Sequence, residues 1–267
     1  MKLQIVPART GTLWVRQGLA TFMRQPLAFI SLFFFFMAVV SMASQLPMIG
    51  GTLALVLLPS MTLALMAAAA HAAEAPQGKP PAGSVFMASL GAVRRDLARL
   101  LVLGALYAAG FLLVMAVSAL ADGGEFAAVY LLGRPLTQEV AEQPGFQAAV
   151  WIAMALYLPL SLAFWHAPAL IHWHGVPPVK SIFFSLVACV RNFGALTVFG
   201  LVWMGVFIAV GIGISLLTGL LVAVGAMGGA EGLGALGNVV MIGGALVLAA
   251  MFFSSVWFSF RDSFSAD

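Results

Sequence analysis

Charged residues are scarce in this chain: Asp, Glu, Lys and Arg together make up 8% of its 267 residues. A soluble globular domain carries about 25% charged residues, so this composition excludes a water-facing surface for most of the protein. Hydrophobic residues make up 63% of the sequence, and we therefore expect most of the surface to face lipid. Cysteine is almost missing as well. The single Cys189 excludes an internal disulfide and a metal site built from cysteines.

Six apolar runs are long enough to cross a bilayer, which requires roughly 20 apolar residues in a helix. Lipid offers no water to backbone N–H and C=O groups, so helices are the expected spanning elements. The sequence therefore predicts an all-α polytopic membrane protein. The predicted transmembrane helices are 27–46, 52–72, 100–121, 148–171, 196–222 and 237–258.

The basic residues are distributed very unequally between the two sides that these six spans define. One side carries Arg134 as its single basic residue, together with five acidic residues. Basic segments stay in the cytoplasm, so we predict an inner-membrane protein with both termini cytoplasmic and an outer loop at 122–147. We interpret the basic residues as orientation signals and do not expect nucleic acid as a partner. The other eleven basic residues are Lys2, Arg9, Arg16, Arg24, Lys79, Arg94, Arg95, Arg99, Lys180, Arg191 and Arg261.

Three segments of the chain align without gaps around Arg24, Arg95 and Arg191. Each has a leucine five residues before the arginine and a polar residue directly after it. We interpret each segment as an amphipathic helix in the cytoplasmic interface, followed by a two-helix hairpin. The prediction is one transmembrane domain, 1–267, built from three internal repeats at 8–74, 80–175 and 177–267. The matching leucines are Leu19, Leu90 and Leu186, and the polar residues are Gln25, Asp96 and Asn192.

The repeat carries three further expectations. Apolar residues at i, i+4 and i+7 in each amphipathic segment, such as Val15, Leu19 and Phe22, predict a lipid-facing stripe. The polar residue after each arginine is expected to cap the following helix. Each unit starts and ends on the same side, so the copies are predicted to be related by a pseudo-threefold axis along the membrane normal.

Equivalent positions give Arg24, Arg95 and Arg191 a shared hypothetical role. Each lies where an interfacial helix meets the N-terminus of a span, and such an N-terminus attracts anions. A guanidinium group binds phosphate in bidentate fashion, so the three arginines are candidate seats for the phosphate of an anionic membrane lipid. The alternative is that each arginine only anchors its helix by reaching toward the headgroups.

Several short stretches resemble an uncharacterised family of proteobacterial multi-pass inner-membrane proteins. The resemblance covers the whole chain, and its most specific parts are Trp173-His174-Gly175 and Phe260-Arg261-Asp262. It implies a fold and a compartment but brings no activity. The other matching stretches are Val6-Pro7-Ala8-Arg9 with Gly11, Trp14 and Gly18; Arg24-Gln25-Pro26-Leu27; Ala167-Pro168-Ala169-Leu170; and Pro178 with Lys180, Phe183-Phe184-Ser185 and Arg191-Asn192.

Histidines gather near the cytoplasmic end of the fourth span. His172 and His174 point about 200° apart on a helix, which is poor geometry for a shared metal ion, so no metal is expected and both are interpreted as interfacial. His166 lies deeper, between Pro159 and Pro168. An ionisable group inside a span is a candidate functional site. The structural alternative, which we favour, is a hydrogen bond to a carbonyl that a proline leaves free.

No residue set in the sequence carries a recognisable catalytic or transport chemistry, and no cofactor is expected. The first hypothesis is a non-enzymatic membrane protein that binds lipid or a partner through its cytoplasmic interfacial helices. The alternatives are a transporter or channel for a small or amphipathic solute, and an intramembrane enzyme. The glycines of the fifth span are expected to be close-packing positions between helices. These glycines are Gly200, Gly205, Gly211, Gly213 and Gly219.

The charge distribution makes the topology testable. Reporter domains fused at Glu139 and at Lys79 are expected to report opposite sides of the membrane, because the two positions are separated by an odd number of predicted spans. The measurement is the activity of a reporter that works on one side only. A report from the same side at both positions would contradict the six-span topology.

Overall fold

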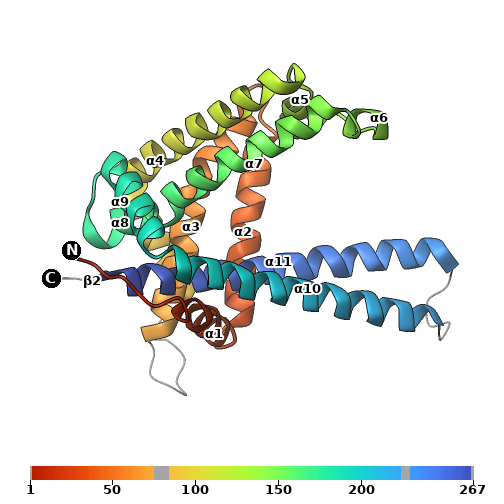
Figure 1. Ribbon diagram of the computed structural model, residues 1–267. Helices are drawn as coiled ribbons and strands as arrows, with labels where there is room; N and C mark the ends of the chain where they lie inside the picture. The colour runs from red at the N-terminus through yellow and green to blue at the C-terminus, as the bar shows by residue number, and fades with distance from the viewer. Residues whose placement is uncertain (1, 75–83, 224–228, 266–267) are drawn as a thin grey trace. The chain divides into compact units, whose positions relative to one another are not determined.

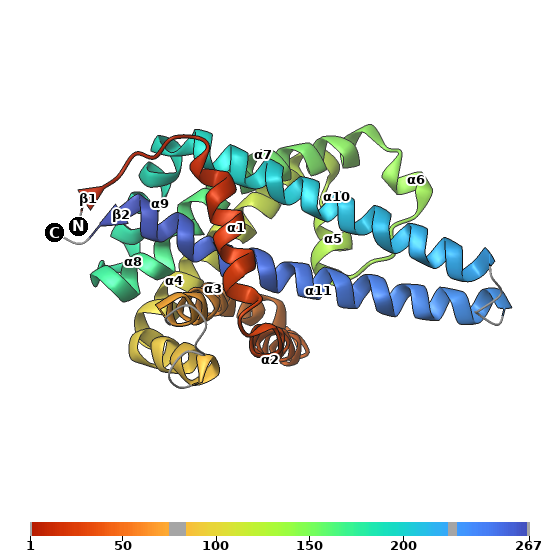
Figure 2. The same cartoon turned by 90° about the horizontal axis from the view of Figure 1, so that it is seen from below.

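The computed structural model describes the backbone of residues 2–74, 84–223 and 229–265, and their side chains outside 221–240. Lys79 therefore lies outside the described residues, and so does the start of the glycine-rich stretch before the sixth span, 225–228. Figure 1 shows the helices, and Figure 2 labels both short strands. They are β1 (Lys2–Leu3), α1 (Thr10–Phe22), α2 (Pro26–Ser44), α3 (Gly50–Glu74), α4 (Val85–Asp122), α5 (Glu125–Leu132), α6 (Gln138–Ala141), α7 (Pro144–Trp165), α8 (Ala167–His174), α9 (Pro178–Arg191), α10 (Phe193–Ala223), α11 (Gly229–Ser263) and β2 (Phe264–Ser265).

The described helices include six segments that are long and apolar enough to cross a membrane. They correspond one to one with the predicted spans, so the all-α, six-span fold is confirmed. The fourth crosses the break between α7 and α8. The segments are Pro26–Ser44, Gly50–Glu74, Val85–Asp122, Pro144–His174, Phe193–Leu220 and Met241–Ser263.

Two compact units make up the structure, and each is assembled from separate parts of the chain. Unit 1 contains Met1–Phe36, Ala64–Gly91 and Arg191–Asp267, and unit 2 contains Met37–Leu63 and Ala92–Val190. The helices α2, α3 and α4 therefore each contribute to both units. The three-repeat organisation and its pseudo-threefold axis stay predictions.

In unit 1, α1 crosses α10 and α11 at very close range (Figure 2). Two glycines make this approach possible. A Cβ atom on Gly11 would collide with the carbonyl oxygen of Ala195, and one on Gly18 would collide with the backbone of Ser255. The indole N–H of Trp14 also donates to Asp262 on α11, at 2.9 Å.

This packing contradicts the predicted lipid-facing stripe of α1. Val15 and Phe22, two of its three residues, are 3% and 1% exposed. The side chains of α1 that remain exposed, such as Leu13 and Arg16, lie on the other face. The prediction is wrong here because glycines at helical spacing let two other helices cover the apolar face of α1. Apolar periodicity alone does not distinguish a lipid-facing stripe from a protein-facing one.

Asn192 fastens the N-terminal segment of unit 1 to the C-terminal segment. Its side-chain oxygen accepts from the Val6 N–H at 2.9 Å, and its amide donates to the Gln4 carbonyl at 3.0 Å and to the Ser263 hydroxyl at 3.2 Å. Beyond this point β1 and β2 pair in antiparallel fashion. The Asn192 side chain is therefore occupied away from α10, and the prediction that it caps that helix is wrong.

The glycines of α10 also differ from expectation. A Cβ atom added at Gly200, Gly205, Gly211, Gly213 or Gly219 would meet no other atom within 4 Å. These positions are therefore not close-packing contacts within the described part of the chain. The close approaches in unit 1 are made instead by Gly11 and Gly18 of α1.

Unit 2 is organised around α4, which breaks at Asp96, where the backbone leaves helical geometry (φ −111°, ψ 16°). From Asp96 to Asp122 the helix rises about 39 Å at 1.5 Å per residue. A bilayer with its headgroups is about 40–45 Å thick. Gly104 lets α3 approach α4, because a Cβ atom there would collide with the Val56 carbonyl. Tyr107 packs edge-on against Phe164 of α7 at 5.2 Å.

Helix α9 presents two different faces. Its protein-facing side is made of small residues, including Ser181, Ser185 and Cys189, all of which are fully buried. Val179 and Phe183 are 67% and 62% exposed and lie within 40° of each other on the helix. This exposed apolar stripe is what an interfacial helix requires. The amphipathic character of α9 is thus as predicted, but its exposed stripe differs from the predicted one, since Cys189 packs inward.

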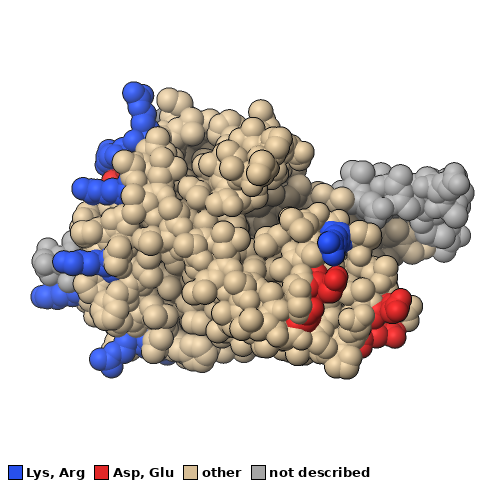
Figure 3. All heavy atoms as spheres, turned by 90° about the horizontal axis from the view of Figure 1, so that it is seen from above, with Lys and Arg blue, Asp and Glu red and all other residues tan. Residues whose placement is uncertain are grey.

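The predicted outer loop contains two short helices, α5 and α6. Asp122 starts α5 by accepting hydrogen bonds from the N–H groups of Gly124 at 2.8 Å and Phe126 at 2.6 Å. The sequence of this part of unit 2 contains several acidic residues, among them Glu125 and Glu139. Figure 3 shows acidic side chains, in red, gathered on one part of the surface. This acidic region lies at the end of α4 opposite to its arginines.

The close crossing of α1 predicts a sharp difference between two glycine substitutions. Gly18→Ala is expected to lower the free energy of unfolding by about 1–3 kcal/mol, because its methyl group overlaps the Ser255 backbone. Gly91→Ala is the matched control, since Gly91 lies in a helix with open space around it. There the change is expected to be neutral or stabilising by up to about 1 kcal/mol. Denaturant titration in mixed micelles, followed by circular dichroism, measures both. Equal losses would contradict the close crossing.

Candidate functional site

The fourth span is interrupted at His166, between α7 and α8. In a continuous helix the His166 N–H would donate to the Leu162 carbonyl four residues earlier. Here the hydroxyl of Ser185, on α9, stands between them. It accepts from the His166 N–H at 2.9 Å and donates to the Leu162 carbonyl at 2.9 Å. A side chain inserted into the helical ladder in this way is a known cause of helix kinks.

His166 itself is 1% exposed and lies beside the buried Cys189, with 3.9 Å between Nδ1 and Sγ. Burial raises the pKa of the Cys189 thiol to about 12. A thiol that stays protonated is neither a nucleophile nor a good metal ligand, so Cys189 is a packing residue. Ser185 provides the partner for the backbone groups of His166 and Leu162 at the break, and the structural role expected of the His166 side chain stays a prediction. The proposal of an intramembrane polar site at His166 stays a prediction.

The basic end of unit 2 contains an ion pair that connects α4 and α8. His172 Nδ1 lies 2.8 Å from a carboxylate oxygen of Asp96, and the two side chains are 11% and 9% exposed. The carboxylate accepts, so Nδ1 carries the proton of this hydrogen bond. The other Asp96 oxygen lies 3.8 Å from the Arg99 guanidinium. Asp96 thus links two helices, and the expectation that it serves as a helix cap is replaced by this role.

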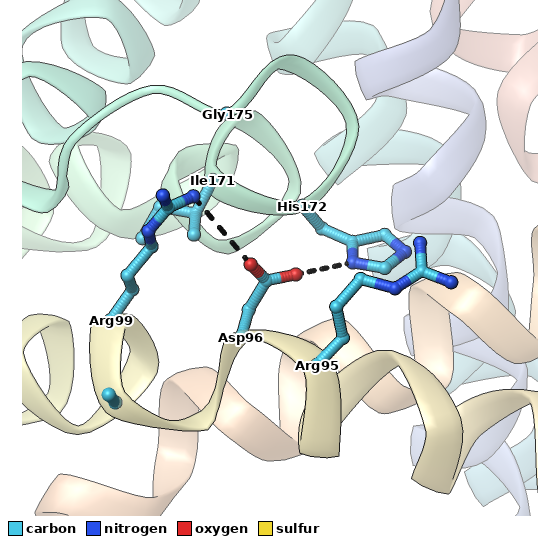
Figure 4. A pocket seen from close by; sticks show the side chains of 7 residues that line it. Arg95, Asp96, Arg99, Ile171, His172 and Gly175 are labelled. Carbon is cyan, nitrogen blue, oxygen red and sulfur yellow. Dashed lines mark hydrogen bonds and ion pairs between the residues drawn. The ribbon is translucent and has the colours of Figure 1, made fainter.

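A hollow of about 460 Å³ opens next to this ion pair. Figure 4 shows Arg95 and Arg99 reaching from α4 on either side of Asp96, with His172 and Gly175 facing them from the α8 end. Both arginines are exposed, and the Arg99 side chain is 54% exposed. Two guanidinium groups outnumber the single carboxylate, so the hollow carries an excess of positive charge. Its chemistry suits a small anionic group.

The three arginines aligned by the repeat lie in different surroundings. Arg95 lines the hollow. Arg24 follows α1 and donates to the Ala72 carbonyl of α3 at 2.9 Å, within unit 1. Arg191 is the exposed last residue of α9. Of the three, Arg95 is the one that the described structure places beside a hollow together with a second arginine.

Sequence reasoning missed the pairing of Asp96 with His172. The two residues are 76 positions apart, and each has an adequate local explanation, as a cap and as an interfacial histidine. One signal was available. Asp96 is the only carboxylate among the basic residues between the second and third spans apart from Glu74. A carboxylate at a membrane-adjacent helix break needs a partner, and His172 is at the corresponding end of the next span.

The sequence comparison finds a relative along the whole chain. A protein of Burkholderia thailandensis described as a "probable inner membrane protein" is 39% identical over 266 residues, which cover 99% of this chain and 94% of the relative. No family model and no solved structure matches the chain. The relative supports a membrane location for the six apolar helices and says nothing of a ligand.

The inserted hydroxyl predicts that Ser185→Ala destabilises the protein. The change removes the partner of the buried His166 N–H, which costs about 1–3 kcal/mol. It also leaves the Leu162 carbonyl with the weak Cys189 thiol contact, at 3.5 Å, in place of a hydroxyl. Ser181→Ala is the matched control, because the Ser181 hydroxyl, also buried, donates only to the Pro178 carbonyl of its own turn, at 2.7 Å. Unfolding in mixed micelles should show a clearly larger loss for Ser185→Ala. A loss no larger than that of the control would contradict the role of Ser185 in the kink.

Proposed function

We propose a binding function for this chain, which belongs to the same family of inner-membrane proteins as the Burkholderia thailandensis relative. The proposed ligand is the phosphate group of an anionic membrane lipid, and the proposed seat is the hollow beside Arg95 and Arg99. The observation that carries the proposal is this hollow, with two exposed arginines held next to a buried Asp96–His172 pair. The proposal is non-enzymatic and needs no cofactor.

The proposed orientation places the hollow at the cytoplasmic surface, with both termini on that side. Support comes from α4 alone. It carries Arg94, Arg95 and Arg99 near one end and Asp122 at the other, about 39 Å away along the helix. A helix of this length reaches both headgroup regions. Basic residues favour the cytoplasmic side, where anionic lipids also attract them.

The Asp96–His172 pair restricts how Asp96 interacts with the two arginines beside it. Asp96 is held by His172, so its carboxylate is not free to neutralise both arginines at once. The Arg99 guanidinium lies 3.8 Å from the carboxylate, beyond hydrogen-bonding distance, and Arg95 makes no hydrogen bond to it within the described part of the chain. Both guanidinium groups can therefore bind a phosphate oxygen. Guanidinium–phosphate contacts are short, directional and roughly twice as strong as neutral hydrogen bonds.

The predicted three-repeat arrangement extends the lipid-binding proposal to the two arginines that align with Arg95. If the repeats are related by a pseudo-threefold axis, Arg24 and Arg191 occupy places equivalent to Arg95 and lie at one depth in the cytoplasmic headgroup region. We propose that they act as weaker lipid contacts, since Arg24 already donates to the Ala72 carbonyl. The amphipathic α9, with exposed Val179 and Phe183, is the further surface through which such a protein touches lipid.

The test compares two double variants with the same change in net charge. Arg95→Gln/Arg99→Gln removes the arginines of the hollow, and Arg94→Gln/Lys180→Gln removes exposed basic residues of unit 2 that do not line it. Phosphatidylglycerol and cardiolipin retained after purification in mild detergent are measured by mass spectrometry. We expect about tenfold lower retention in the first variant, because a hydrogen bond to a charged group contributes about 1.5–3 kcal/mol. Equal retention in the two variants would leave the arginines as orientation signals only.

A further inference from the structure

A second hollow, of about 210 Å³, lies in unit 2 between α4, α5 and α7. Its floor is buried: Phe111 and Ala153 are each 7% exposed. Its rim is open: Tyr130, Met154 and Tyr157 are 64%, 58% and 42% exposed. The hollow thus opens over the exposed surfaces of α5 and α7.

Helical geometry gives the depth of this hollow along α4. Phe111 lies about 18 Å along the helix from Arg99, and Met115 lies about 10 Å from Asp122. Both positions are inside a hydrocarbon layer of about 30 Å that is centred between the two charged ends. The open rim therefore faces lipid chains, and a ligand reaches the hollow from within the bilayer. This depth separates it from the arginine hollow at the end of α4.

Aromatic rings form most of the wall. Phe111 packs edge-on against Tyr157, with ring centres 6.2 Å apart and planes at 89°. Phe111 and Tyr130 are 6.0 Å apart, as are Phe126 and Tyr130. Aromatic rings in such offset and edge-on arrangements attract a further ring beyond what its buried area contributes. An apolar cavity of about 150 Å³ is known to hold benzene, so this hollow has room for one substituted ring.

Tyr157, one of the residues that line the hollow, shares a hydrogen bond with Tyr107, which does not line it. The hydroxyl oxygens of Tyr107 and Tyr157 are 3.3 Å apart, longer than the 2.7–2.8 Å typical of such a bond. The shared bond uses one of their two protons, and the other proton has no acceptor among the contacts described for these residues. A hydroxyl proton without an acceptor is costly inside hydrocarbon. A ligand oxygen that accepts this proton would remove that cost, whereas an acyl chain would not.

We infer that this hollow binds a single-ring aromatic molecule that carries one oxygen, of the phenol class, and that partitions into the membrane. The ring lies against Phe111, Tyr130 and Tyr157, and its oxygen accepts the free proton of the tyrosine pair. Helix α5 supplies one wall and has no buried residue; it is bounded by left-handed glycines, Gly124 (φ 96°) and Gly133 (φ 67°). Because α5 buries no side chain, it can move slightly and adjust to the size of the bound ring.

The test uses 4-fluorophenol and the full-length protein in phosphatidylcholine nanodiscs, with binding followed by fluorine NMR against empty nanodiscs. We expect saturable binding. Ala153→Leu, which fills the hollow, should weaken it at least tenfold. Tyr157→Phe removes one hydroxyl with little change in shape and should weaken it about threefold to tenfold, while binding of fluorobenzene stays unchanged. Leu158→Val, an exposed position on the same helix, is the control.

Three results would overturn the inference. The first is the absence of saturable binding by the wild-type protein. The second is equal binding by wild type and Ala153→Leu, with circular dichroism showing that both are folded. The third is displacement of 4-fluorophenol by 1-fluorooctane at a similar concentration, which would identify the hollow as a place for lipid chains. The Arg95→Gln/Arg99→Gln variant should bind 4-fluorophenol normally, so this site and the proposed phosphate seat succeed or fail separately.

Discussion

Every backbone N–H and C=O group inside the hydrocarbon layer needs a partner within the protein, because no water is available there. The fourth span meets this requirement at its break through Ser185, whose hydroxyl replaces the direct bond between His166 and Leu162. This contact fixes α9 against the end of α7. It also allows α8 to start in a new direction, and His172 on α8 then reaches Asp96 on α4. The candidate site at the basic end of unit 2 thus depends on how one broken helix is repaired.

The sequence allowed the number of spanning helices and their approximate positions to be predicted, because apolar length is a direct measure of what can cross a bilayer. It also located helix breaks correctly, at the polar residues that follow Arg24, Arg95 and Arg191. In the structure α1 ends at Phe22, α4 leaves helical geometry at Asp96 and α9 ends at Arg191. Polar residues between apolar runs mark such breaks because they have no favourable place in lipid.

Predictions about what each face contacts were less successful. The stripe of α1 that includes Val15 and Phe22 is covered by protein, and the glycines of α10 meet no neighbouring element at close range within the described residues. In a membrane protein lipid and protein interior are both apolar, so hydrophobicity does not tell which of them a residue meets. The sequence clue lay in the glycines of α1, since Gly11 and Gly18 are seven residues apart and lie on one face of the helix.

The candidate site could not be predicted, because it consists of a long-range pair whose members each had a local explanation. The same structure shows how similar segments come to differ. Arg24, Arg95 and Arg191 hold matching places in the sequence, yet Arg24 meets the Ala72 carbonyl, Arg191 is exposed at a helix end, and Arg95 stands beside a buried ion pair. The surroundings of Arg95 come from Asp96, Arg99 and His172, and the residues aligned with Asp96 in the other two segments, Gln25 and Asn192, carry no charge. A repeated pattern can therefore provide three basic positions at the membrane surface, while the residues added around one of them give that position a shape and a charge suited to a ligand.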